Sequence, residues 1–149
     1  MKYRENFFNS DSTGDHFSTL ESDKKSMLFL VPLVQTAWAH GAVSPREKQV
    51  IFEAAREEGI DEKHDFNSEL DRWLVYQPSQ EFFDDCLEQI ENEMRAMTVK
   101  ERGVKLEMLL RRCERVAASA GEKSRMDVNH AVSPEEKNLL AAIKQTLSF

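Results

Sequence analysis

The chain of 149 residues is poor in the residues that build tight turns and cross-links. It has 5 glycines and 4 prolines, which are too few for the turns of a many-stranded sheet, so the composition favours a helical fold. The two cysteines, Cys86 and Cys113, cannot form a disulfide framework, and no cysteine or histidine pair has the spacing of a zinc site. Because both thiols fall on apolar faces of expected helices, we interpret them as packed cysteines in a reducing compartment.

Charge and hydropathy exclude further classes. The net charge of −7 does not provide the basic face that phosphate binding needs, so nucleic acid is not an expected partner. The strongest apolar run, residues 27–39, has 13 residues and includes Pro32, whereas a membrane span needs about 20. Residues 1–23 also lack the apolar run of a signal peptide. We therefore expect a cytoplasmic protein without a membrane span.

The motifs of the common enzyme classes are missing as well. The sequence has no nucleophile elbow, no glycine loop for phosphate and no HExxH pair. His16, His64 and His130 lie in different loops or helix ends and have no catalytic partner that spacing identifies. The expectation is a non-enzymatic protein with no catalytic residue and no organic cofactor.

Helical periodicity dominates what is present. Residues 1–21 are expected to form a mostly irregular arm, in which Phe7, Phe8 and Phe17 are candidates for a docking segment. Residues 22–149 are expected to form one compact all-α domain of six or seven helices. Six of these helices can be placed by periodicity, at about 23–40, 45–58, 62–76, 80–97, 99–120 and 134–147. The first is apolar on most sides, which indicates the centre of the core.

One short phrase occurs twice, 89 residues apart. The segments 42–48 (AVSPREK) and 131–137 (AVSPEEK) share six of seven residues, and each opens a helical pattern. Each contains a serine N-cap, a proline at the first helical position and a glutamate three residues after the serine, which are the parts of a capping box. The repeat predicts two related helical halves, with Glu47 and Glu136 at equivalent helix starts.

The helices at 80–97 and 99–120 differ in charge. The first carries an acidic series, and the second is basic on balance. We expect the opposite charges of the two helices to pair along the edge of their contact. The alternative is that the acidic side chains form an exposed binding face. The residues of that candidate interaction surface are Glu81, Asp84, Asp85, Glu88 and Glu91.

The segment 37–47 (AWAHGAVSPRE) resembles the signature of the TerB-like, tellurite-resistance family, in which an Ala-x-Ala-Asp-Gly helix end leads into a capped helix with an early glutamate. A second, interrupted match begins at 118–121 and rejoins the phrase at Ala131 after an insert. The resemblance covers residues 25–149 and implies an all-helical fold of two similar halves. It also implies a stress-response scaffold or sensor that acts through contacts with a protein partner, or an adaptor similar to a co-chaperone. The sequence is compatible with a homo-oligomer and does not decide the oligomeric state.

The family's acidic residues have been proposed to hold a metal ion, and this chain departs from them. His40 and Ala120 stand where the resemblance leads us to expect acidic residues before Gly41 and Gly121. Only Glu47 and Glu136 match acidic positions of the motif.

The alternative function is a metal-responsive protein that binds a divalent cation at the two repeat turns. His40 and Glu47 would contribute at the first turn, and Asp127, His130 and Glu136 at the second. The second turn is not an EF-hand, because position 12 from Asp127 is Asn138.

Overall fold

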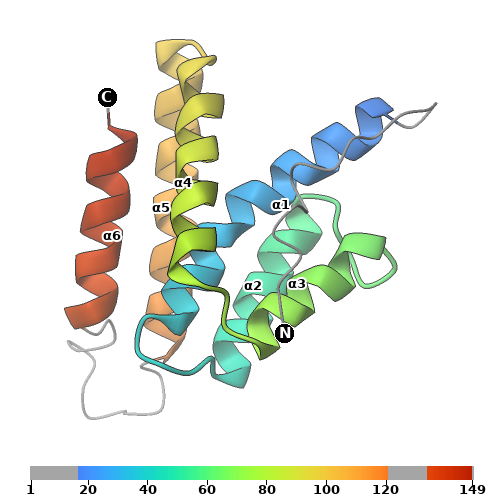
Figure 1. Cartoon of the computed structure of the whole chain (residues 1–149), viewed down its shortest axis with the longest axis vertical. Helices are drawn as coiled ribbons and strands as arrows, with labels where there is room; N and C mark the ends of the chain where they lie inside the picture. Colours follow the sequence, from blue (N-terminus) through green and yellow to red (C-terminus); the bar gives the residue numbers. More distant parts are fainter. Residues whose placement is uncertain (1–16, 121–133, 149) are drawn as a thin grey trace.

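The computed structural model describes residues 17–120 and 134–148, and within these ranges the chain forms six α-helices and no strand (Figure 1). The helices are α1 (Phe17–Trp38), α2 (Pro45–Glu57), α3 (Asp65–Val75), α4 (Gln80–Arg95), α5 (Val99–Ala120) and α6 (Pro134–Leu147). This confirms the all-α expectation, and the bounds of α2, α5 and α6 agree with the predicted ranges to within one residue. Phe7 and Phe8 lie outside the described residues.

The start of α1 differs from the prediction by six residues. The Ser22–Asp23 pair was expected to cap a helix at residue 23, but the helix begins at Phe17, inside the segment expected to be irregular. No glycine or proline lies between Gly14 and Pro32 to end a helix there. Ser22 is exposed, so its hydroxyl can point into solvent from within a helix instead of capping one.

The core is built around α1, as its apolar residues on most sides predicted. This helix contacts each of the other five, and Met27, Leu30, Leu33 and Val34 on it are fully buried. Trp73 of α3 and Ile90 of α4 are buried in the same cluster. The other helices therefore take their positions from the surface of α1 that each one covers.

The hairpins α1–α2 and α5–α6 are the two places where the repeated phrase occurs. They contact each other through α1 and α5 and also through α2 and α5. Figure 1 shows that the C-terminal end of α1 and the first turns of α2 and α6 lie at the same end of the molecule. The packing of the two hairpins thus brings the helix starts after both copies of the phrase to one region.

Two arginines of α5, Arg112 and Arg115, form ion pairs with glutamates at α2. Arg112 of α5 forms ion pairs with Glu57 at 3.0 Å and with Glu58 at 2.9 Å, at the end of α2. Arg115 pairs with Glu53 of α2 at 3.5 Å. The prediction that the basic helix complements acidic α4 is therefore wrong for these two arginines. The cause is that α2 packs along α5 and supplies three glutamates from the side that the arginines face.

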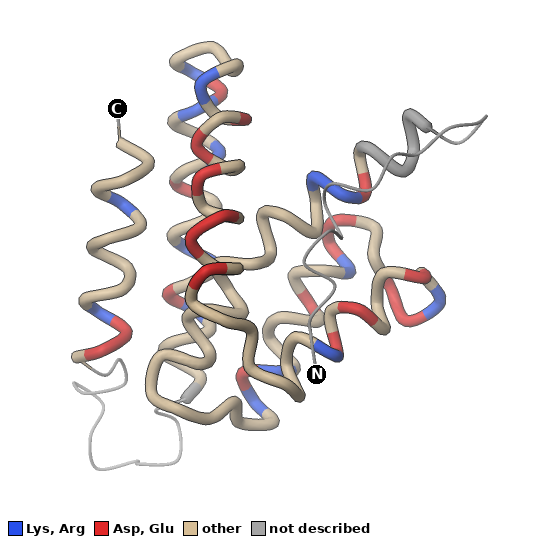
Figure 2. Tube along the Cα trace, viewed as in Figure 1, with Lys and Arg blue, Asp and Glu red and all other residues tan. Residues whose placement is uncertain are grey.

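The acidic side chains of α4 remain largely in solvent. Glu81, Asp84, Asp85 and Glu88 are exposed, and Glu91 is half-buried. Figure 2 shows that acidic residues recur along α4. Within α4, Asp84 accepts a hydrogen bond from Gln80, and Glu91 pairs with Arg95. These five residues thus form one acidic side of α4, which we call the α4 acidic surface.

No helix in the described part of the chain has the length and apolarity that crossing a membrane needs.

Both cysteines are packed, as the sequence indicated. Cys86 is 1% exposed and Cys113 is fully buried. Burial disfavours the charged thiolate and raises the pKa of each thiol to about 12.

We expect a disulfide reagent such as Ellman's reagent to label neither cysteine in the native protein at pH 8, and to label both after denaturation. Rapid labelling of either thiol without denaturant would contradict the packing described here.

Candidate metal site

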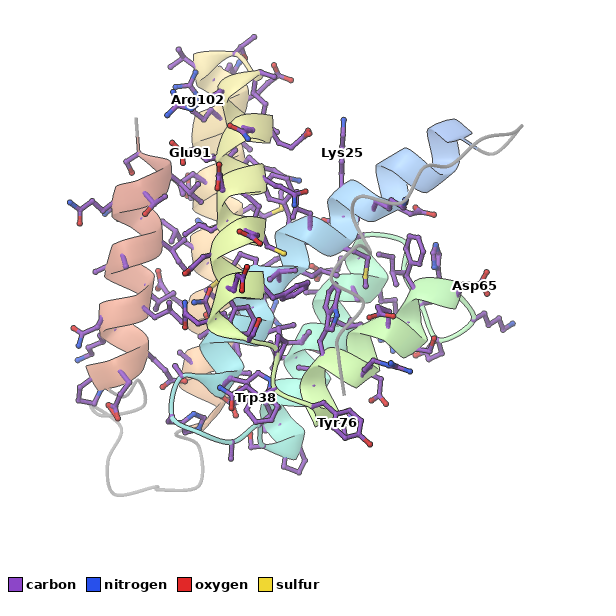
Figure 3. The ribbon with its side chains drawn as sticks, in the orientation of Figure 1. Lys25, Trp38, Asp65, Tyr76, Glu91 and Arg102 are labelled. Atoms are coloured by element: carbon purple, nitrogen blue, oxygen red, sulfur yellow. The ribbon has the colours of Figure 1, made fainter. Side chains whose placement is uncertain are left out.

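The turn after α1 presents His40. The turn is closed by a hydrogen bond from Gly41 N to Trp38 O at 2.9 Å, and Gly41 has φ +98°, a left-handed conformation that glycine adopts without strain. Trp38, labelled in Figure 3, donates from Nε1 to the carbonyl oxygen of Trp73 in α3 at 2.9 Å. The end of α1 is therefore fixed to α3, and the turn that carries His40 starts from a fixed point.

Glu47 comes from the first turn of α2 and is held by the predicted capping box. The Glu47 backbone N–H donates to Ser44 Oγ at 3.1 Å, and the Ser44 N–H donates to Glu47 Oε1 at 2.8 Å. Ser44 has the extended backbone of an N-cap, with φ −81° and ψ 158°. The capping box uses one carboxylate oxygen of Glu47 and thereby fixes the direction of the other.

That other oxygen is the unusual feature of the region. The Glu47 side chain is 0% exposed, and its Oε2 is buried without a hydrogen-bond partner among the described residues. A buried carboxylate oxygen is costly unless a hydrogen bond or a cation compensates for the lost water. The capping box does not explain this oxygen, because it uses Oε1.

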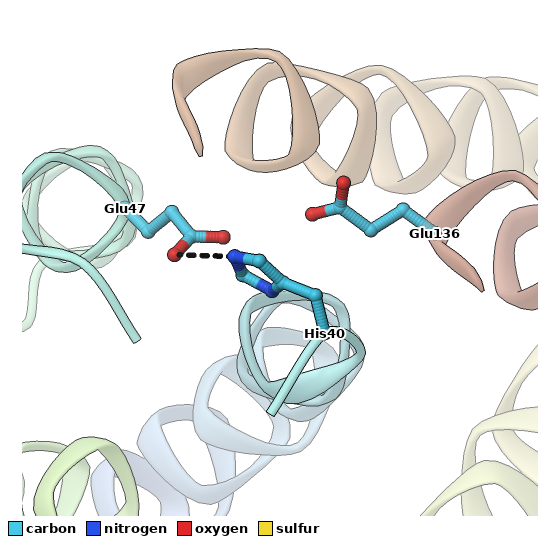
Figure 4. A group of neighbouring side chains, drawn as sticks. All are labelled: His40, Glu47 and Glu136. Carbon is cyan, nitrogen blue, oxygen red and sulfur yellow. Dashed lines mark ion pairs between the residues drawn. The ribbon is translucent and has the colours of Figure 1, made fainter. Parts of the chain in front are cut away.

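Glu136 reaches the same place from the first turn of α6. It is 1% exposed and lies one turn into the helix, at the position equivalent to that of Glu47. Figure 4 shows the two carboxylates facing each other across the ring of His40. The two glutamates of the repeated phrase, far apart in sequence, therefore converge on one histidine.

The three side chains are close enough to share one ligand. His40 Nε2 lies 3.8 Å from Glu47 Oε1. One potential ligand atom from each of His40, Glu47 and Glu136 lies within 4.8 Å of the other two. The His40 side chain is 32% exposed, so the cluster opens to solvent on the histidine side.

Two carboxylates at this distance repel each other. Two unit charges about 5 Å apart repel by about 3 kcal/mol when the effective dielectric constant is about 20. Burial is the main cause that raises the pKa of Glu47 above its ordinary value of 4.5. The hydrogen bonds to Ser44 and the charge of His40 lower it, and the Glu136 carboxylate raises it further. A positive ion between the carboxylates would remove both the repulsion and the burial penalty of their charges.

The donor set suits a first-row divalent metal. One imidazole nitrogen and two carboxylates give three protein ligands, which is the number found at zinc sites that keep a position for water. Magnesium and calcium prefer oxygen ligands alone, so the histidine favours zinc, manganese or iron(II). Two ligands of one zinc ion, each about 2.1 Å from it, lie at most about 4.2 Å apart, so binding would draw the three groups slightly closer.

Three of the five metal candidates named from the sequence meet in this cluster, and they form one site instead of two separate turns. The other two, Asp127 and His130, lie outside the described residues, as does Ser133, the expected cap of α6. The candidates of the α4 acidic surface belong to a different helix.

Two features outside this cluster were not found from the sequence. His64 caps α3 through Nδ1, which accepts from Phe66 N at 2.9 Å, while its Nε2 lies 2.8 Å from Asp23 of α1. A cavity of about 400 Å³ lies between α2 and α5, lined by Arg46, Gln49, Val50, Glu53, Arg115, Ala118 and Ser119. None of the three cluster residues lines it.

Comparison of the chain with protein-family models, with curated proteins and with solved structures gives no match. The interpretation of the cluster therefore depends on its geometry and chemistry.

The capping role of Ser44 can be tested apart from metal. We expect Ser44→Ala to lower the free energy of unfolding by about 1 kcal/mol, because the Glu47 N–H loses its acceptor. Ser44→Asp should keep most of the stability, since aspartate is also a good cap. Urea denaturation in a chelating buffer measures both. An alanine variant as stable as the wild type would show that Ser44 contributes no cap.

The raised pKa of Glu47 predicts a pH dependence in the metal-free protein. Because the folded state holds this proton more tightly than the unfolded state, the stability that Glu47 contributes is present below pH 4.5. It is lost as the pH rises from 4.5 through the raised pKa. Glu47→Gln removes this titration, so the variant should gain stability relative to the wild type as the pH rises. Urea unfolding of both proteins from pH 4.5 to 7.5 in chelator measures the difference. A difference that does not change with pH would contradict the assignment.

Proposed function

We propose that this protein is a helical module that binds one divalent first-row metal ion through His40, Glu47 and Glu136. The observation that carries the proposal is the buried Glu47 Oε2, which has no hydrogen-bond partner among the described residues and faces a second buried carboxylate across a histidine ring. An ion at this position would satisfy that oxygen and neutralise the carboxylate pair. We assign the ion a structural or sensing role and no catalytic step.

The proposal adapts the TerB-like resemblance to this sequence. The resemblance implies acidic residues before Gly41 and Gly121. This chain has a histidine, His40, in place of the first of them, and the histidine changes which metal ion the site would prefer. Replacing a carboxylate by an imidazole shifts the preference from calcium or magnesium toward zinc, manganese or iron(II). We therefore propose a TerB-like module with a different metal preference, and the metal-responsive alternative becomes the leading function.

The α4 acidic surface supports a second candidate function, a scaffold for a protein partner. Its exposed carboxylates are not the ion-pair partners described above for Arg112 and Arg115 of α5, because these two arginines pair with glutamates at α2. They would attract a partner with a basic surface. A stress-response scaffold, or an adaptor similar to a co-chaperone, would use such a surface, and a metal ion at the other site does not conflict with it.

Thermal unfolding tests the metal proposal. The chelator-stripped chain should be melted with and without Zn²⁺, Mn²⁺, Ca²⁺ and Mg²⁺. An ion that binds only the folded state adds about 2.7 kcal/mol at 100 times its dissociation constant, which corresponds to a rise in Tm of about 5–10 °C for a chain of this size. We expect this rise with Zn²⁺ or Mn²⁺, and a much smaller one with Ca²⁺ or Mg²⁺.

Matched variants identify the ligands. Glu47→Gln should abolish the rise in Tm, although glutamine can still complete the capping box. Glu101→Gln is the control, because Glu101 forms the same capping box with Thr98 at the start of α5 but is exposed and lies outside the cluster. Equal responses of these two variants to the ion would refute the site. Asp127→Asn and His130→Ala test whether the segment before α6 adds a ligand.

A further inference from the structure

α6 packs against three other helices, α1, α4 and α5. It buries few side chains completely where it meets them. Its fully buried residues are Ile143, Leu147 and Glu136. One of the three side chains that α6 buries completely is therefore a carboxylate.

The buried apolar surface of α6 is small beside that of α4. The 16 residues of α4 bury five side chains, all apolar, namely Phe82, Phe83, Cys86, Ile90 and Met94. The 14 residues of α6 bury two apolar side chains, and Leu139 and Leu140 are only partly covered. Because burial of apolar surface is the main force that holds a helix in place, α6 should be among the most easily detached.

The metal cluster lies at the contact between α6 and the rest of the molecule. Glu136 belongs to α6, whereas His40 and Glu47 belong to the α1–α2 hairpin. Detachment of α6 would carry Glu136 away from the other two residues and divide the ligand set. With no ion, the docked helix places Glu136 against the Glu47 carboxylate, so repulsion opposes docking. With an ion, the same two carboxylates are joined through it.

We propose that the metal ion acts as a clasp that controls whether α6 is docked. This inference rests on the proposed metal site and adds a consequence for conformation. In the metal-free protein α6 opens without unfolding of the remaining helices, and metal binding closes it. The opening exposes the apolar side of α6, with Ile143 and Leu147, together with the surface that they cover on the other helices. Metal availability would thus be converted into the exposure of a binding surface.

Amide hydrogen exchange on the full chain tests the clasp, with mass spectrometry of peptides from α6 and from the buried part of α1. In chelator, α6 amides should exchange much faster than those of α1, because α6 opens alone. At a free Zn²⁺ or Mn²⁺ concentration 100 times the dissociation constant, the protection of α6 should rise about 100-fold, since each opening must first release the ion. Binding is measured separately by equilibrium dialysis.

The outcomes separate the two proposals. If the ion binds but α6 and α1 exchange at the same rate in chelator, α6 does not open alone and the clasp is refuted, while the metal site stands. If the ion binds but leaves α6 exchange unchanged, the clasp is again refuted. If no ion is retained in dialysis, both proposals fail.

A variant tests the repulsive half of the clasp without any metal. Glu136→Gln removes one of the two facing charges and keeps the size of the side chain. In chelator at pH 7.5, the variant should show slower α6 exchange than the wild type, and added ion should give no further protection. Lys137→Gln is the matched control, because Lys137 is the exposed neighbour on the same turn and the substitution also removes one charge. Faster α6 exchange in Glu136→Gln, or an equal effect in the control, would overturn the proposal.

Discussion

The convergence of two buried carboxylates on one histidine is the constraint that most needs explaining in this molecule. Glu47 and Glu136 lie at helix starts, where the positive end of the helix dipole favours a negative side chain. That effect accounts for a glutamate at each position but not for the burial of both within reach of each other. Burial makes each charge costly and proximity makes the pair costly, so the fold retains an arrangement that a cation would relieve.

The repeated phrase links the architecture to this chemistry. A capping box needs a carboxylate or amide three residues after the cap, and it uses one oxygen of that side chain. In Glu47 the second oxygen is left for another purpose. When two such hairpins pack through α1, α2 and α5, the starts of α2 and α6 lie at the same end of the molecule. The glutamates that the helices need locally then come within reach of each other and of His40, as a pair of metal ligands would have to. The exposed box of Thr98 and Glu101 shows the same local motif without that consequence.

The sequence predicts the parts of this structure that depend on neighbouring residues. Ser44, Thr98 and Pro134 mark helix starts through short-range signals, and the structure has helices beginning at these points. The predicted start of α1, at residue 23, was wrong because a serine–aspartate pair within a helix has the same sequence as a helix cap. The role of His64 was missed because an imidazole cap on α3 that also reaches Asp23 depends on how α1 and α3 pack. The sequence likewise gave His40 and Glu47 as candidates at one turn and Glu136 at another. That the three residues form one cluster depends on how α6 packs against the rest of the chain, which spacing in the sequence does not show.

X-ray absorption spectroscopy of the zinc-loaded protein tests the central claim most directly, because it reports the atoms bound to the metal. The proposed site predicts a first shell of nitrogen and oxygen at about 2.0–2.2 Å with the scattering pattern of one imidazole, and no sulfur at about 2.3 Å. In His40→Ala the imidazole pattern should disappear. A sulfur shell, an imidazole signal that persists in that variant, or zinc that is lost on dialysis would contradict the assignment of His40, Glu47 and Glu136 as ligands.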